Sequence, residues 1–185
     1  MIINKLTRGM KRTLLTFGIL ILLAGYGLAQ EDGVKWLTIQ QAQELNKKEP
    51  RKFFIDVYTD WCGWCKKMDQ TTYKDPVVAK ILNTKFYPVK FNAESKEPVE
   101  FAGHKFEYQS NGGRGSHQLA IALLQGKLAF PSVAYLDEKL QLLTVVPGYF
   151  TAEGLEPILQ YFATNAYKTT SWQDYQKSFV SEIKK

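Results

Sequence analysis

The only two cysteines of this 185-residue chain, Cys62 and Cys65, follow closely on an apolar, β-prone run over residues 53–58. The run predicts a buried strand, and a helix is expected to start near Cys62. A strand-to-helix turn at this point would place both thiols at the start of the helix. The same Cys-x-x-Cys spacing also supplies half of many zinc sites. The spacing by itself therefore fits a redox dithiol, half of a metal site or a short disulfide staple.

The first 29 residues are expected to be a secretory signal peptide. They contain a basic start, an apolar stretch over 14–24 and small residues before a cleavage position at Ala29. The apolar stretch is too short to cross a bilayer comfortably, and no cysteine follows it to carry a lipid anchor. An uncleaved membrane anchor is the alternative. We therefore expect a periplasmic or secreted protein with no stable membrane insertion after cleavage.

The positive charge of the chain belongs mostly to this leader. Removing its four basic residues from the total of 24 leaves 20 basic residues against 18 acidic ones. The remaining chain is nearly neutral, so charge gives no reason to expect a nucleic-acid partner.

Export also bears on the cysteine pair. Exported proteins often use disulfides as staples, but a bridge between Cys62 and Cys65 closes a loop of only four residues and removes little entropy from the unfolded chain. A redox couple is the better explanation. A metal site would need His104 and His117, whose separation exceeds the usual three to five positions, so no metal is expected.

Apolar patterns and helix-capping residues predict strands that alternate with helices and end in a hairpin, which is typical of a mixed α/β sheet with helices on both faces. A polar, glycine-rich stretch over 95–116 interrupts this alternation as an insertion with a small hairpin. The expected strands are 34–37, 53–58, 86–91, 133–136 and 140–146, and the expected helices are 38–46, one from about 62, 76–82, 118–124, 151–164 and one from 171 through Ile183.

Several separate positions resemble thioredoxin, from about residue 34 to 164. The run Trp61-Cys62-Gly63-x-Cys65-Lys66 has the residues of that family's active-site motif, and Asp56 stands six positions before the first cysteine, where thioredoxins carry a buried acid. Lys90 matches the lysine of the third strand. Phe130 and Pro131 match the cis-proline segment, and Gly148 matches a glycine beside the substrate groove.

The resemblance implies an α/β thioredoxin fold with a mixed central sheet. The expected domain is 30–166, with the 95–116 insertion before the helix that leads to the cis-proline, and 167–185 is an extra C-terminal helical extension. Trp64 departs from the proline of thioredoxin, and exported thioredoxin-like proteins with Trp-Cys-x-Trp-Cys-Lys are more similar. The direction of electron flow therefore stays open between reduction, oxidation and isomerisation.

The chemistry assigns distinct catalytic roles to four residues. A helix N-terminus lowers the pKa of the Cys62 thiol, so Cys62 is expected to be the exposed attacking thiolate and Cys65 the resolving one. A buried Asp56 can accept the proton of Cys65, and Lys90 can tune that acid. The alternative for Asp56 is an inert, hydrogen-bonded acid.

The expected substrate-binding residues surround the cysteines. The alternative for Trp61 and Trp64 is ordinary half-buried packing. The alternative for Pro131 is a trans peptide bond that starts an edge strand. The predicted set is Trp61, Gly63, Trp64, Phe130, Pro131 and Gly148.

The predicted function is thiol–disulfide exchange with exported proteins, or electron relay from a membrane thiol reductase. No cofactor is expected beyond the redox-active Cys62–Cys65 disulfide. The alternatives are a metal-binding module on the two cysteines and a non-catalytic adaptor that binds client polypeptides.

Overall fold

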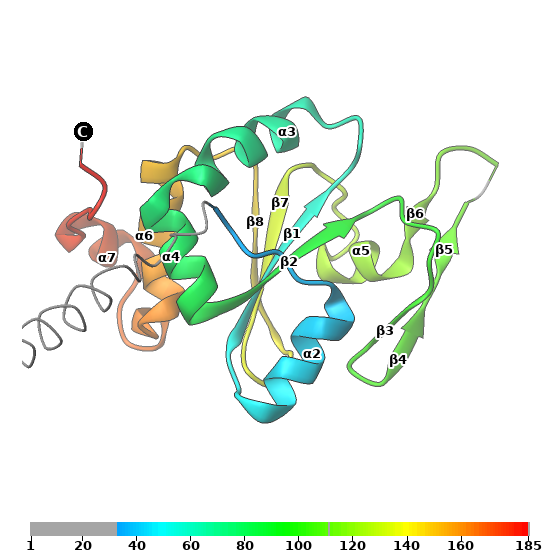
Figure 1. The fold of residues 1–185 in the computed structure, drawn as a ribbon, viewed down its shortest axis with the longest axis horizontal. Coiled ribbons are helices and arrows are strands. Elements are labelled where there is room, and N and C mark those ends of the chain that lie inside the picture. Colours follow the sequence, from blue (N-terminus) through cyan, green and yellow to red (C-terminus); the bar gives the residue numbers. More distant parts are fainter. Residues whose placement is uncertain (1–32, 111, 185) are drawn as a thin grey trace, which may run out of the picture. The chain divides into compact units, whose positions relative to one another are not determined.

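A four-stranded mixed sheet forms the centre of the protein (Figure 1). The computed structural model describes residues 33–110 and 112–184, so the predicted leader lies outside the described residues. The strand order is β2–β1–β7–β8; β1 and β2 are parallel, and the other two pairs are antiparallel. The strands are β1 (Lys52–Tyr58), β2 (Phe86–Asn92), β7 (Ser132–Leu136) and β8 (Leu142–Pro147).

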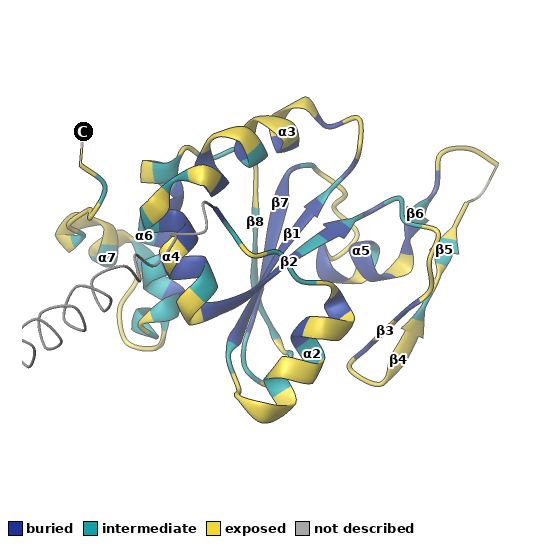
Figure 2. Cartoon of the chain, viewed as in Figure 1, coloured by how far each residue is buried: buried dark blue, intermediate teal, exposed yellow. Residues whose placement is uncertain are grey.

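Helices cover both faces of this sheet, as the sequence predicted. They are α2 (Ile39–Lys48), α3 (Gly63–Gln70), α4 (Pro76–Lys85), α5 (Gln118–Leu123), α6 (Ala152–Ala163) and α7 (Trp172–Ser178), with 3-10 turns over Thr72–Lys74 and Ala166–Lys168. Side chains of β1 alternate between two apolar clusters. Phe53 and Ile55 join the cluster of α2 and α5, whereas Phe54 joins that of α3, α4 and α6. Figure 2 shows the mostly buried strands β1, β2 and β7 between these partly exposed helices.

Local capping signals fix where the helices begin. Thr38 and Gln41 form a reciprocal capping box at the start of α2. Asp75 accepts the first amide hydrogen bonds of α4, which starts at Pro76. Thr151 accepts from Gly154 at the start of α6. These starts depend on neighbouring residues, which is why the sequence predicted them.

The first expected strand, 34–37, is wrong. Only Leu37 pairs with the sheet, through an isolated parallel bridge to Val89 at the edge of β2. The segment leads directly into Thr38, the N-cap of α2, so one residue has an extended partner before the helix begins. The described sheet therefore has four strands rather than five.

The C-terminal helix is shorter than predicted. It ends at Ser178, so Ile183 lies beyond it. The reason is a buried carboxylate on α6: Glu156 accepts hydrogen bonds from the Ser181 hydroxyl and from the backbone N–H of Glu182, the latter at 2.6 Å. A continuous helix would not offer both groups to one side chain.

The 95–116 insertion contains two small hairpins where one was expected. They pair β3 (Val99–Phe101) with β4 (His104–Phe106), and β5 (Tyr108–Gln109) with β6 (Ser116–His117). Phe101 is buried in the cluster of α2 and α5. The backbone N–H of His117 donates to the Ala93 carbonyl at 2.7 Å, which ties the end of the insertion to the end of β2.

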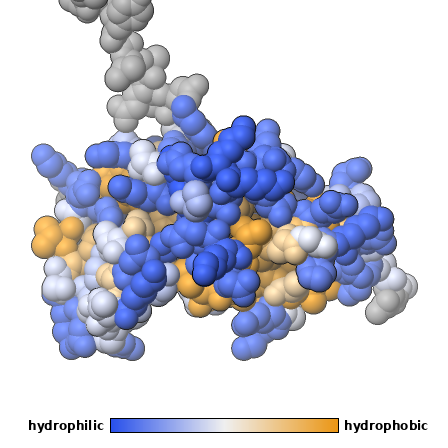
Figure 3. Space-filling view, turned by 90° about the horizontal axis from the view of Figure 1, so that it is seen from below, coloured by the Kyte–Doolittle hydropathy of each residue, from blue (hydrophilic) through white to orange (hydrophobic). Residues whose placement is uncertain are grey.

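The lower surface in the view of Figure 1 is mainly hydrophilic, with smaller hydrophobic areas between polar side chains (Figure 3). Among the helices of residues 33–110 and 112–184, none has the length and apolar character needed to cross a membrane.

Candidate functional site

The two cysteines form a disulfide at the first turn of α3. Cys62 is the N-cap of this helix, and its Sγ accepts a hydrogen bond from the backbone N–H of Cys65 at 3.1 Å. The strand β1 ends four positions earlier, so a short turn carries the chain from the buried strand to the helix. A thiolate on Cys62 would therefore lie where helix N–H groups and the helix dipole favour negative charge.

Both cysteines are nearly buried in this disulfide form. Cys62 is 5% exposed and Cys65 is 2% exposed. Cys62 was expected to be an exposed thiol; in the disulfide form it is nearly buried and only the more accessible of the pair. The adjacent Gly63 is exposed and faces open space. Access to the disulfide is therefore set by the side chains around Gly63.

Two tryptophans flank this opening. Trp61 is 52% exposed and Trp64 is 62% exposed, which makes them two of the few strongly exposed large hydrophobic residues in the described part of the chain. Trp61 packs edge-on against Phe130 at 5.9 Å between ring centroids, and Trp64 lies 5.0 Å from the ring of Tyr149. We call these four residues the aromatic rim. Large exposed apolar surface of this kind is typical of an interaction site.

The proline segment meets the rim through Phe130. The Phe130–Pro131 peptide bond is cis, as the sequence predicted. The Pro131 carbonyl accepts a hydrogen bond from the N–H of Gly148 at 2.8 Å. Gly148 has a φ of +104°, which favours glycine over other residues. Phe130, Pro131 and Gly148 thus lie together beside Trp61.

The predicted acid and lysine are direct neighbours in the sheet. Asp56 on β1 and Lys90 on β2 are register partners, and Lys90 Nζ lies 2.5 Å from Asp56 Oδ2. Lys90 also forms a very short ion pair with Asp69 on α3, one helical turn after Cys65. Side-chain alternation places Asp56 on the same sheet face as Phe54, which is the face covered by α3. One ammonium therefore joins the buried acid to the helix that carries the cysteines.

Burial and charge act in opposite directions on this pair. Burial raises the pKa of Asp56, and the Lys90 ammonium offsets only part of that effect. Burial works against the charge of Lys90, but the two carboxylates outweigh it and raise the lysine's pKa. Asp56 Oδ1 is buried and receives no hydrogen bond from the described residues. This oxygen is available to hold a proton.

Aromatic rings complete the surroundings of Lys90. Its ammonium lies 5.0 Å from the ring centroids of Trp36 and Tyr58, and 5.1 Å from that of Tyr73. Each ring face attracts a cation. The lysine is thereby held charged next to Asp56.

The two histidines are not arranged with the cysteines. His117 uses one ring nitrogen to accept from Leu119 N–H and places the other 3.0 Å from the Glu97 carbonyl. His104 lies on β4 of the insertion. Within the ranges that the structure describes, no group of three potential metal ligands occurs. The geometry gives the metal-module alternative no support.

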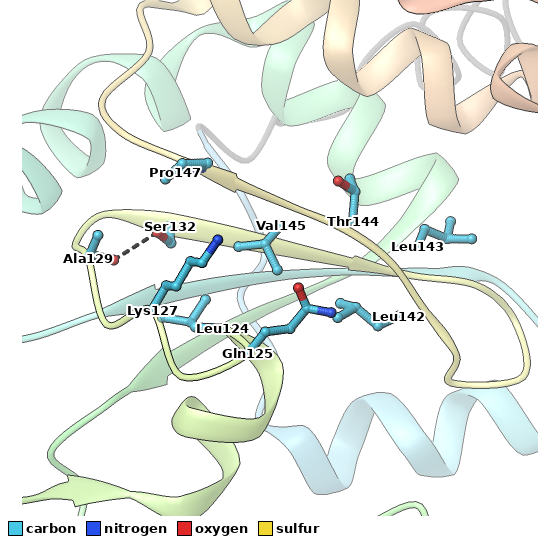
Figure 4. Close-up of a pocket in the computed structure, with 10 residues that line it drawn as sticks. All are labelled: Leu124, Gln125, Lys127, Ala129, Ser132, Leu142, Leu143, Thr144, Val145 and Pro147. Atoms are coloured by element: carbon cyan, nitrogen blue, oxygen red, sulfur yellow. Dashed lines mark hydrogen bonds between the residues drawn. The ribbon is translucent and has the colours of Figure 1, made fainter.

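A separate pocket of about 460 Å³ lies between β8 and the loop that follows α5 (Figure 4). Leu124, Lys127 and Val145 line it, and the Ser132 hydroxyl donates to the Ala129 carbonyl at 2.7 Å at one end. Neither cysteine lines this pocket. It is therefore distinct from the opening at the disulfide.

Sequence reasoning missed four residues near the predicted site. Asp69 could have been found from its spacing, because it lies one turn after Cys65 on the same helix. Tyr149 follows Gly148 directly. Glu94 and Arg114 contact Trp61 only through tertiary structure, so no local pattern indicated them.

Comparison with known proteins relates the chain to one family. The family model Thioredox_DsbH, described as "Protein of unknown function, DUF255", matches residues 26–181. The match includes the cysteine pair, the acid and the proline segment.

Solved structures show the same fold. The structure of a DsbH oxidoreductase aligns with 75% of this chain and 87% of its own, at 16% identity and a TM-score of 0.51. A thioredoxin-fold protein from Helicobacter pylori aligns with 81% of this chain and 93% of its own, at 12% identity and a TM-score of 0.55.

Among curated relatives, spermatogenesis-associated protein 20 of Mus musculus is 26% identical over 76 residues, which are 41% of this chain. The chain spans about a tenth of the length of the curated relatives it matches.

Proposed function

The chain belongs to the Thioredox_DsbH family, whose members are thioredoxin-fold, disulfide-oxidoreductase-like proteins, and we propose that it exchanges disulfides with polypeptide clients through Cys62 and Cys65. One observation carries this proposal: the disulfide lies across the first turn of α3, beneath an exposed aromatic rim and beside the Pro131 segment. This arrangement supplies a polarised thiol, a second thiol within reach and apolar surface for a polypeptide.

In the reductive direction, the Cys62 thiolate attacks one sulfur of a client disulfide. A bond forms between Cys62 Sγ and that sulfur, the client bond breaks, and the other client sulfur leaves as a thiolate. The Cys65 thiolate then attacks Cys62 Sγ and releases the second client thiolate. Two electrons pass from the protein dithiol to the client, and the protein is left with the Cys62–Cys65 disulfide. Oxidation of a client dithiol is the same sequence reversed.

Asp56 takes part in the second step of this scheme. Cys65 must lose its proton before it attacks, and a buried carboxylate is basic enough to accept that proton directly or through a water molecule. Burial raises the pKa of Asp56, and the charges of Lys90 and Asp69 adjust it. Lys90 thus acts through Asp56 rather than on the sulfur atoms.

The proposed clients are exported proteins with cysteines or disulfides, met in the periplasm or outside the cell after removal of the leader. A dithiol protein, such as a membrane thiol reductase, would return the dithiol form when the protein works as a reductase. No nucleic acid, metal or organic cofactor takes part. The Cys62–Cys65 pair itself is the redox group.

Cysteine variants test this function. Cys65→Ser is expected to hold clients as mixed disulfides on Cys62, visible as adducts that a reductant releases on non-reducing gels. Cys62→Ser should abolish both these adducts and insulin reduction. Full insulin-reducing activity in Cys62→Ser would refute the proposal.

The reduction potential then separates the possible directions. A value at or below about −200 mV favours a reductase, whereas a value near −120 mV favours an oxidant.

A further inference from the structure

Trp61 is held at the opening of the disulfide by two charged residues that belong to no motif. Its indole Nε1–H donates to Glu94 Oε1 at 3.1 Å. The guanidinium of Arg114 lies over the same ring, 5.1 Å from its centroid. Arg114 Nε is also 3.4 Å from the same Glu94 oxygen. The three side chains form a closed set of contacts, which fixes both the edge and the face of the indole.

The chain builds this set from three separate segments. Trp61 precedes the redox helix, Glu94 follows β2, and Arg114 stands near the tip of the 95–116 insertion. Glu94 is anchored because its backbone N–H donates to Asn92 Oδ1 at 2.9 Å. The Asn92 amide in turn donates to Asp60 Oδ2 at 3.0 Å, next to Trp61 in sequence.

Contacts at the tip of the insertion fix the position of Gly115, the residue next to Arg114. The N–H of Gly115 donates to the Tyr108 hydroxyl at 2.8 Å. A Cβ atom at Gly115 would lie only 2.1 Å from the Gln109 carbonyl oxygen, so the β5–β6 hairpin closes at this point only with glycine. The residue after Arg114 is thereby fixed against the hairpin.

Trp61 controls the approach to a nearly buried sulfur. Cys62 follows it directly, and Phe130, which precedes Pro131, lies against its ring edge. We expect a polypeptide that reaches Cys62 to contact this ring, whereas a small disulfide can approach past Gly63, where an added Cβ would meet no atom within 4 Å. Fixing the ring before binding removes an ordering cost from polypeptide binding.

We propose that Arg114 and Glu94 are positioning residues that hold Trp61 as a wall of the client groove, so that the insertion sets preference for polypeptide disulfides over small ones. The inference rests on the proposed exchange function. Both residues act through Trp61 and neither touches the sulfur atoms in the described structure.

The test compares two substrates in Arg114→Ala and Glu94→Gln. In Arg114→Ala, which loses one exposed cation–π contact and one exposed ion pair, the KM for insulin disulfides is expected to rise about three- to tenfold. Glu94→Gln loses only the ion pair, so its KM should rise by less. The rate with oxidised glutathione should stay within about twofold of the wild-type rate. The reduction potential should not change. Arg114→Lys keeps the charge but not the planar guanidinium, so its KM should lie between those of wild type and Arg114→Ala.

Arg51→Ala is the matched control. Arg51 also pairs with a glutamate, Glu49 at 2.6 Å, and lies over a ring, that of Tyr87 at 5.5 Å, but it precedes β1 at the end opposite Cys62. Arg51→Ala should leave the KM for insulin and the rate with oxidised glutathione unchanged. The indole N–H resonance of Trp61, assigned with Trp61→Phe, should move in Arg114→Ala and Glu94→Gln and stay in place in Arg51→Ala.

Two results would overturn the inference: an unchanged insulin KM, or an equal loss with both substrates. Failure of the proposed function looks different, because wild-type protein would then turn over neither substrate.

Discussion

Asp56 and Lys90 face each other on neighbouring parallel strands, and the ammonium of Lys90 lies 2.5 Å from Asp56 Oδ2. Asp56 is 1% exposed, and its other oxygen has no partner among the described residues. Burying an ion pair costs desolvation that its attraction seldom exceeds by much. The pair is therefore a poor source of stability, and the Asp56 carboxylate is a suitable proton acceptor.

Asp56→Asn is expected to stabilise the fold at neutral pH relative to wild type. Burial raises the pKa of Asp56 in the folded state, so the folded protein retains a proton that the unfolded chain has released. The stability due to this proton is complete below the ordinary value of 3.8 and is lost as the pH rises through the raised pKa. Asparagine does not titrate, so the variant does not lose this stability as the pH rises. Urea unfolding at neutral pH and at a pH near the ordinary aspartate pKa measures the difference in free energy of unfolding between variant and wild type.

The exposed Asp174 provides a contrasting control, because its hydrogen bonds with Lys177 and Ser171 lower its pKa. Asp174→Asn should lose stability at neutral pH rather than gain it. A gain in Asp56→Asn that is equal at both pH values would contradict the assigned cause.

The same Asp56→Asn change is expected to slow the release of clients from Cys62. Without the carboxylate, Cys65 loses its proton to water, and loss of a general base typically costs about 10²-fold or more. Rapid-quench measurement of the mixed disulfide separates this step from the first attack, which should keep its wild-type rate. An unchanged release rate would show that Asp56 is an inert acid that takes no part in the exchange.

Asp69→Asn is expected to shift the pH profile of client release to lower pH. The charge of Asp69 raises the pKa of Asp56, and Asp69 also shares the Lys90 ammonium. Removing Asp69 leaves Lys90 to Asp56 alone, so both effects lower the pKa of Asp56. Single-turnover rates measured across pH test this, with Asp174→Asn on α7 as the control. A shift to higher pH would show that Asp69 acts by another route.

Much of the fold could be predicted because its signals are local. The capping groups of Thr38 and Asp75 lie within three residues of the amides they bind, and the continuous apolar run of β1 is visible in its own sequence. The cysteine turn, Asp56, Lys90 and the cis-proline segment followed from resemblance at separate positions. Their roles in catalysis remain predictions.

The remaining features depend on residues brought together by the fold. Arg114 reaches Trp61 from 53 positions away, through a hairpin whose packing no periodicity encodes. Leu37 forms one bridge instead of a strand because Thr38 starts a helix immediately. The early end of α7 depends on Glu156, which receives the Glu182 amide 26 positions along the chain.

That carboxylate leads to a prediction on stability. Glu156 is fully buried, and Glu156→Ala would leave the Glu182 N–H and the Ser181 hydroxyl without their acceptor. We expect the free energy of unfolding to fall by about 1–3 kcal/mol, the cost of unsatisfied polar groups. The C-terminal segment should also become sensitive to protease, because its backbone loses its attachment to α6. Glu44→Ala, an exposed residue on α2, should change stability by less than about 0.5 kcal/mol. Wild-type stability together with wild-type protease resistance in Glu156→Ala would show that the aromatic contacts of Trp172 and Tyr175 with Tyr161 suffice to hold the extension.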